Sequence, residues 1–244
     1  MLLAPPPIVP RLVAADAAVQ AALRQWNGGG RVPRALATAV LHEQLLELKL
    51  ADHPRLYRVV LPTLPRRLRQ DVADDVTARR DLESLAPPKS VKGPRLRIGP
   101  ALPALRLRSY YLEAQRRTGV AWQILAAINY VESDFGRLRE PSWAGAQGPM
   151  QFIRSTWAQY GHGNVHDPHA AILAAARFLH AAGAPAHERA AVHHYNPSWR
   201  YVDAVEHDAA RIRRDPRALL VLYSRQLLRR TKHGWALLTH VGLR

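Results

Sequence analysis

The spacing of apolar and polar residues along the chain predicts a mainly helical protein. In several segments the apolar residues fall on one helical face, as Leu68, Val72 and Val76 do. Prolines and glycines interrupt this pattern and set the expected helix ends. We expect helices over residues 13–26, 33–50, 52–61, 65–85, 109–118, 124–136, 155–160, 168–181, 188–194 and 201–213. Residues 218–228 fit either a helix or a strand, and the pattern leaves residues 235–243 unassigned.

The prolines also suggest how the chain is divided. Residues 1–12 are proline-rich and expected to be extended, and residues 87–103 hold five prolines and two glycines, which is typical of a linker. We therefore expect a small helical module over residues 1–86, a linker over 87–103, a second domain over 104–213 and a C-terminal extension over 214–244. A chain of 244 residues is long enough for one sizeable domain or two small ones.

Composition and charge narrow the possible partners. The net charge is +16, and no cysteine is present, which excludes disulfides and thiolate-metal sites. A basic surface favours polyanions, but no basic tract with interleaved aromatics is found, so we expect no nucleic-acid partner. The start, Met-Leu-Leu-Ala-Pro-Pro-Pro, lacks the basic region of a signal peptide, and no apolar run is long enough to predict a transmembrane helix.

One acidic residue interrupts an apolar helix face. At about 100° per residue, Ile124, Leu125, Ile128 and Val131 share a face, and Glu132 falls on the same face. Apolar surroundings and the negative end of a helix both disfavour a carboxylate and raise its pKa. A carboxylic acid that stays protonated near neutral pH can act as the general acid of glycoside cleavage. On the helix alone, a structural glutamate paired with an arginine or with backbone is the commoner interpretation.

Three separated motifs favour the catalytic interpretation. Together they resemble those of the lytic murein transglycosylases, peptidoglycan-cleaving enzymes with a goose-lysozyme-like domain, and most closely the membrane-bound lytic transglycosylase B branch. The resemblance covers about residues 104–205. The motifs are Glu132-Ser133-Asp134-Phe135-Gly136, then Ser142-Trp143-Ala144-Gly145-Ala146 leading to Gly148-Pro149-Met150-Gln151-Phe152, and finally Tyr195-Asn196.

The resemblance implies a lysozyme-like fold for residues 104–213 and a role for each motif. Glu132 would be the sole catalytic acid and base. Gln151 and Asn196 would hydrogen-bond the sugar chain, Met150 would line the cleft, and Tyr195 would orient Glu132 or the substrate. Two serines complete the expected substrate-binding set: Ser133, beside the glutamate, and Ser142, a polar neighbour of the catalytic carboxyl. The sequence departs from the family pattern at Pro149, where leucine is usual, and at Arg154, where proline is usual.

A second carboxylate would change the expected chemistry. If the helix continues, Asp134 points roughly 160° away from Glu132, so we expect it to be solvated or structural. A lone carboxylate suits a lytic transglycosylase, in which the C6 hydroxyl of the substrate displaces the glycosidic bond and leaves a 1,6-anhydroMurNAc end. The alternatives are a goose-type muramidase that uses water, a non-catalytic peptidoglycan-binding scaffold and a basic nucleic-acid binder.

Metal and cofactor requirements are expected to be absent. His162, His166 and His169 have a spacing that suits one helical face, but Gly163 and Pro168 break any continuous helix there. We therefore expect no metal and no cofactor. The expected partners are peptidoglycan glycan strands and anionic wall polymers, the expected state is a monomer, and the expected location, inferred from the substrate, is extracellular or at the cell wall.

Overall fold

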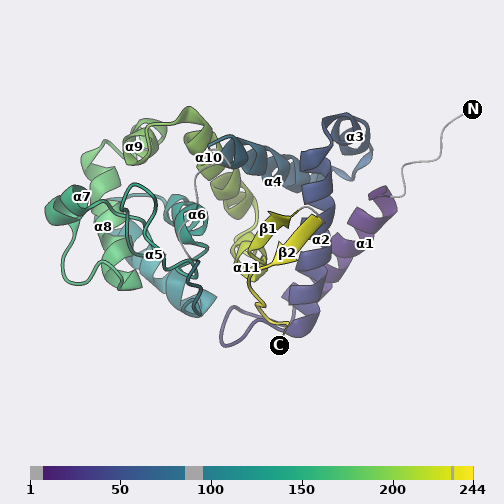
Figure 1. Cartoon of the computed structure of the whole chain (residues 1–244), viewed down its shortest axis with the longest axis horizontal. Helices are drawn as coiled ribbons and strands as arrows, with labels where there is room; N and C mark the ends of the chain where they lie inside the picture. Colours follow the sequence, from purple (N-terminus) through teal and green to yellow (C-terminus); the bar gives the residue numbers. More distant parts are fainter. Residues whose placement is uncertain (1–7, 86–95, 232–233, 244) are drawn as a thin grey trace, which may run out of the picture.

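The computed structural model describes residues 8–85, 96–231 and 234–243, and over this part the protein is mainly helical (Figure 1). A single two-stranded antiparallel sheet is present in the described residues. The helices are α1 Ile8–Leu23, α2 Arg34–Asp52, α3 Pro54–Val60, α4 Arg66–Ser84, α5 Ala104–Thr118, α6 Trp122–Ser133, α7 Arg154–Tyr160, α8 Pro168–Ala181, α9 Glu188–Tyr195, α10 Trp199–Arg214 and α11 Ala218–Ser224; the strands are β1 Leu228–Thr231 and β2 Gly234–Leu237.

The predicted fold class is confirmed, and most helices lie where the pattern placed them. The N-terminus is a correction: residues 8–12, expected to be extended, form the start of α1, and Pro10 lies in its first turn. Proline is tolerated there because the first backbone N–H groups of a helix have no partner within it. Residues 218–228 contain both candidate structures, since α11 ends at Ser224 and β1 begins at Leu228.

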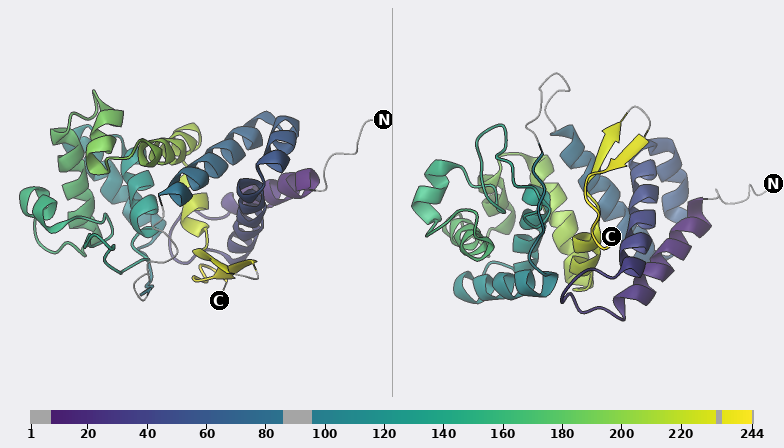
Figure 2. Two further views of the ribbon diagram at one scale, coloured as in Figure 1. Left: turned by 45° about the horizontal axis from the view of Figure 1, so that its top comes forward. Right: turned by 60° about the horizontal axis from the view of Figure 1, so that its bottom comes forward.

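The N-terminal helices pack directly against the remainder of the chain. One cluster of buried apolar side chains includes Leu23 and Leu36 from α1 and α2 as well as Ile128 from α6 and Val205 from α10. A second, smaller cluster joins α1 to α4. Both views in Figure 2 show α4 beside α10, consistent with the extensive contact between these two helices. Residues 87–103 are described only from 96 onwards, and Gly99 donates its N–H to the Arg137 carbonyl at 2.9 Å.

The C-terminal extension forms hydrogen bonds both with the N-terminal helices and with the segment that precedes α5. Gln44 of α2 exchanges two hydrogen bonds with the backbone of Gln226, at 2.9 and 3.1 Å. Tyr223 of α11 donates to the Leu102 carbonyl at 2.9 Å, just before α5. The segment after α10 therefore lies between the N-terminal helices and the central part of the chain. No helix of the described residues is long and apolar enough to cross a membrane.

Buried charges lie where α2, α4, α10 and the chain after α11 meet. Arg225 donates to Glu47 and to Asp75, each at 2.6 Å, and Arg211 also contacts Asp75. Glu43 lies beside Arg211 at 4.0 Å. All of these side chains are almost fully buried. Removing one partner from such a group leaves an uncompensated charge in the interior, which is far more costly than losing a surface ion pair.

We predict that Arg225→Met lowers the free energy of unfolding by about 3–5 kcal/mol, because it leaves Glu47 without its ion-pair partner and removes one of the two arginines from Asp75. The measurement is urea unfolding at pH 7. The matched control is Arg229→Met on exposed β1, for which we expect a change within about 0.5 kcal/mol. Equal stability of the two variants would show that the buried cluster does not hold the N-terminal helices in place.

Candidate active site

Glu132 lies in the last turn of α6, on the face that the sequence predicted. Ile124, Leu125 and Ile128 on that face are fully buried, and Glu132 itself is half-buried. The helix ends one residue later, and the chain then turns through three left-handed residues, with φ of 50° at Asp134, 60° at Phe135 and 84° at Gly136. The helix therefore ends at Ser133, three residues before the expected end at Gly136.

A tyrosine holds the Glu132 carboxyl. The hydroxyl of Tyr201 donates a hydrogen bond to Glu132 Oε1 at 2.6 Å. Tyr201 is only 2% exposed and lies in the first turn of α10, where the Ser198 side chain caps the helix by accepting from the Tyr201 N–H. The sequence predicted an orienting role for Tyr195 and assigned none to Tyr201. The only feature of the sequence that points to Tyr201 is its position six residues after Tyr195, close to the Tyr-Asn motif.

Burial sets the protonation of this group. Burial raises the pKa of Glu132 to about 7, while the hydrogen bond from Tyr201 acts in the opposite direction. Burial, with a smaller contribution from Glu132, raises the pKa of Tyr201 and of Tyr195 well above 10. Both tyrosines therefore stay protonated and able to donate at neutral pH. Glu132 can release and take up a proton at the same pH, which is the requirement for a general acid and base.

A buried hydrogen-bond network ties the end of α6 to the glycine-rich loop. The Pro149 carbonyl accepts from Ser133 Oγ at 2.5 Å and from Asn129 Nδ2 at 2.8 Å. Tyr111 donates to Asn129 Oδ1 at 2.6 Å, and the Gly136 N–H donates to Ser133 Oγ at 2.8 Å. Ser133 is thus fully buried with its hydroxyl used inside the protein, so its position gives it a structural role in place of the expected contact with substrate.

The loop itself is a tight turn. Gln147 and Phe152 pair through two backbone hydrogen bonds of 2.9 Å, and residues 148–151 form the turn between them. Gly148 has φ of 77°, and a Cβ there would lie 2.1 Å from the Val165 carbonyl oxygen, so only glycine fits. Since the network uses the carbonyl of Pro149 and not its side chain, proline can stand where the family has leucine.

Gln151 and Met150 occupy different environments. Gln151 is half-buried with φ of 48°, an unfavourable conformation for a residue with a side chain, and such outliers cluster at functional sites. Its amide donates to the Gly148 carbonyl at 3.0 Å. Met150 is fully buried in the core, so its side chain does not line an open cleft as expected. Its carbonyl instead accepts from the Tyr195 hydroxyl at 2.5 Å.

Tyr195 and Asn196 end α9, and the chain turns at Pro197 into α10. The Tyr195 ring packs against Phe178 and Phe152, with ring centres 5.4 and 6.0 Å away. The Tyr195 hydroxyl therefore bonds the Met150 carbonyl of the loop, whereas the Glu132 carboxyl is bonded by Tyr201. Asn196 is half-buried, and no described residue hydrogen-bonds its side-chain amide. This amide therefore retains its capacity to bind a ligand.

The remaining serine of the expected set shapes a neighbouring turn. Ser142 accepts from the Ala146 N–H through its hydroxyl at 3.1 Å and pairs with the same residue through its backbone. The structure gives it no contact with Glu132. The turn projects Trp143 into solvent, where its side chain is 80% exposed. Arg154, the other departure from the family pattern, is the first residue of α7, a position that accepts proline or arginine without losing a hydrogen bond.

Asp134 is structural, one of the two roles expected for it. It is 5% exposed and forms an ion pair with buried Arg137 at 3.1 Å. Burial raises its pKa to about 6, while Arg137 acts in the opposite direction. Of the histidines considered for a metal, His169 contacts Glu113 at 2.9 Å. The described residues contain no group of three or more acidic or histidine side chains arranged to hold a metal ion.

Comparisons with known proteins concern the segment that contains Glu132. Residues 109–200 match the family model of the transglycosylase SLT domain. A 73-residue segment is 37% identical to the membrane-bound lytic murein transglycosylase F of Thiobacillus denitrificans. That segment covers 30% of this chain and 15% of the relative. No solved structure matches significantly. The predicted resemblance to lytic transglycosylases is confirmed, and the assignment to the B branch stays a prediction.

We predict that Tyr201→Phe raises the pKa of the Glu132 carboxyl by about 1–2 units, because a hydrogen bond to a charged group stabilises the ionised form by about 1.5–3 kcal/mol. Carbon NMR of the labelled carboxyl measures this directly. The matched control is Tyr195→Phe, whose hydroxyl bonds the Met150 carbonyl and not Glu132. A larger shift in the control than in Tyr201→Phe would assign the orienting role to Tyr195.

Proposed function

We propose that this chain, which carries a transglycosylase SLT domain over residues 109–200, is a peptidoglycan lytic transglycosylase with Glu132 as its single acid and base. The bond cleaved is the β-1,4 linkage between MurNAc and GlcNAc. The observation that carries the proposal is the half-buried carboxyl of Glu132, which lies inside the matched family segment, accepts a hydrogen bond from Tyr201 at 2.6 Å and has a pKa raised to about 7.

The proposed reaction needs one carboxyl group. Protonated Glu132 gives its proton to the glycosidic oxygen as the bond to MurNAc C1 breaks. The C6 hydroxyl oxygen of the same MurNAc then bonds to C1, and the Glu132 carboxylate takes the C6 hydroxyl proton. The products are a GlcNAc with a free C4 hydroxyl and a 1,6-anhydroMurNAc end, and Glu132 returns to its starting form. No water is consumed.

The position of Asp134 favours this reaction over hydrolysis by two carboxylates. A retaining or inverting glycosidase pairs its catalytic acid with a second carboxyl that acts as nucleophile or base. Asp134 is the carboxylate nearest to Glu132 in sequence, and it is buried and paired with Arg137. A goose-type muramidase, in which water attacks C1, stays the alternative. A non-catalytic scaffold is less favoured, because a binding module has no need of a buried acid with a raised pKa.

Substrate contacts are assigned to the groups that remain available. Asn196 has an uncommitted amide. Half-buried Gln151 uses its amide nitrogen within the loop and keeps its side-chain oxygen, so we assign these two residues to the glycan strand. The other residues of the expected set form hydrogen bonds within the protein and support the site without contacting the glycan: Tyr195, Met150, Ser133 and Ser142. The charge of +16 favours association with anionic wall polymers. A location at the cell wall follows from this substrate, and the relative named above is described as membrane-bound.

We predict that Glu132→Gln lowers the release of soluble fragments from purified sacculi by at least about 10²-fold, since the amide cannot cycle a proton. The fold should be unchanged in circular dichroism. Near wild-type turnover by this variant would remove Glu132 as the catalyst.

We also predict how the same variant changes stability with pH. The pKa of Glu132 is raised in the folded state from 4.5 to about 7, so the folded protein binds the proton more tightly than the unfolded chain. Its contribution to stability is complete below pH 4.5 and is lost as the pH rises through 7. Glu132→Gln should therefore be more stable than the wild type at pH 8, and the difference should narrow towards pH 4. A constant difference in urea unfolding across this range would contradict the raised pKa.

A second carboxylate is tested by Asp134→Asn. We expect this variant to keep activity within about tenfold of the wild type, after correction for the folded fraction, because Asp134 is an ion-pair partner and not a nucleophile. Its stability should fall, since Arg137 loses its buried partner. A loss of activity as large as that of Glu132→Gln, in a fully folded sample, would support a two-carboxylate mechanism.

A further inference from the structure

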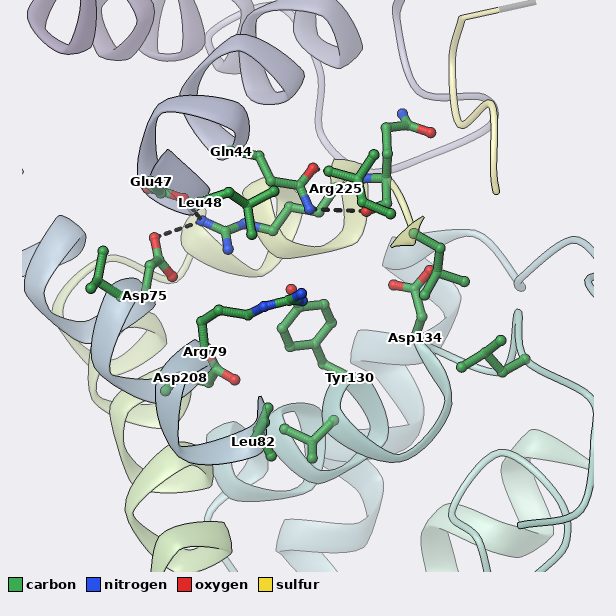
Figure 3. Close-up of a pocket in the computed structure, with 17 residues that line it drawn as sticks. Gln44, Glu47, Leu48, Asp75, Arg79, Leu82, Tyr130, Asp134, Asp208 and Arg225 are labelled. Carbon is green, nitrogen blue, oxygen red and sulfur yellow. Dashed lines mark hydrogen bonds and ion pairs between the residues drawn. The ribbon is translucent and has the colours of Figure 1, made fainter. Parts of the chain in front are cut away.

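A cavity of about 170 Å³ lies behind the candidate active site, where α2, α4, α6, α10 and the start of β1 meet. Figure 3 shows the side chains that surround it. Its wall includes Tyr130 and Val131 of α6 and Asp134, the residue that follows this helix, and these three flank Glu132 along the chain. Asp208 enters from α10, two helical turns after Tyr201. Leucines and valines provide most of the remaining surface.

Carboxylates outnumber the available cations around this cavity. Arg225 is committed to Glu47 and Asp75, and Arg137 is committed to Asp134. Arg79 at the wall pairs with Glu83 at 2.7 Å and stacks on the Trp235 ring at 5.1 Å. No described residue forms a hydrogen bond or ion pair with the Asp208 carboxyl. These arginines are therefore paired with other carboxylates, and Asp208 is left without a cation partner among the described residues.

Several buried oxygens at this cavity lack a hydrogen-bond partner. They belong to four lining carboxyl groups, each at most 5% exposed: Glu47 Oε1, Asp75 Oδ1, Asp134 Oδ2 and Asp208 Oδ2. Burial raises the pKa of Glu47 well above its usual range, and Glu47 hydrogen-bonds Asp75, so the oxygens of Asp134 and Asp208 remain. Buried polar groups are nearly always satisfied, so such orphaned acceptors require an explanation. Burial, with a smaller contribution from Asp75, raises the pKa of Asp208 to about 7. A cation in the cavity would supply the missing donors.

We propose that this cavity binds a small organic cation, a primary ammonium on a short apolar stem, with its head group at Asp208. An ammonium group has three donors and no acceptor, which suits a set of unpartnered carboxylate oxygens. The apolar part of the ligand lies against Leu82 and Val131. A divalent metal fits less well, because the described acidic side chains are not arranged as a metal-binding group. The site is separate from the glycan contacts of Gln151 and Asn196.

The test is titration of the full chain with butylammonium at pH 8, followed by NMR and by thermal unfolding. We expect saturable shifts in the Tyr130 and Val131 amide signals and a rise in Tm. The neutral isostere 1-butanol and the anion butyrate should bind at least tenfold more weakly. Saturable binding of butanol with equal affinity would overturn the proposal, as would no binding of butylammonium up to tens of millimolar.

Two variants locate the site. Asp208→Asn removes the unpaired carboxylate with little change in shape and should weaken butylammonium binding at least tenfold while the protein stays folded. Ala78→Leu fills the cavity from α4 and should block binding with all charges intact. The matched control is Asp203→Asn, on the same helix but paired with Arg189 at 2.6 Å away from the cavity. Binding that is unchanged in Asp208→Asn and Ala78→Leu, or lost equally in Asp203→Asn, would contradict the assignment.

Discussion

The hydrogen bond between Tyr201 and Glu132 joins the two helices on which the site depends. It brings the last turn of α6 to the first turn of α10, and it places a carboxyl group in surroundings that favour its protonated form. An isolated buried carboxylate would be costly, and a fully solvated one would stay ionised at neutral pH. One hydroxyl donor with half-burial gives an intermediate environment, in which the group can hold or release its proton.

The remainder of the fold keeps these two helices in place. On one side, Ser133 and Asn129 fasten the end of α6 to the Pro149 carbonyl, so the catalytic helix and the glycine-rich loop form one unit. On the other side, α4 packs along α10, and Arg211 and Arg225 join these helices to α2 through buried carboxylates. The N-terminal helices therefore support the site from behind. Their packing also encloses the acidic cavity next to α6.

The sequence predicted what depends on local pattern and missed what depends on tertiary contacts. Helical periodicity located α4 and α6, and the helix expected over residues 168–181 is α8. The burial of Glu132 followed from its place on an apolar face. The Tyr201 contact spans 69 residues and has no local signature. Met150 and Ser133 were assigned to the substrate by the family resemblance, and a resemblance between motifs does not fix the direction in which each side chain points.

In the proposed reaction, one carboxyl group cleaves the glycan strand without consuming water. Digestion of purified sacculi in water enriched in heavy oxygen, followed by mass spectrometry of the fragments, tests it most directly. The proposed reaction predicts that the dominant MurNAc ends carry no heavy oxygen and are lighter by one water than a reducing end. Incorporation of heavy oxygen at C1 of most MurNAc ends would contradict it and would identify the protein as a hydrolase.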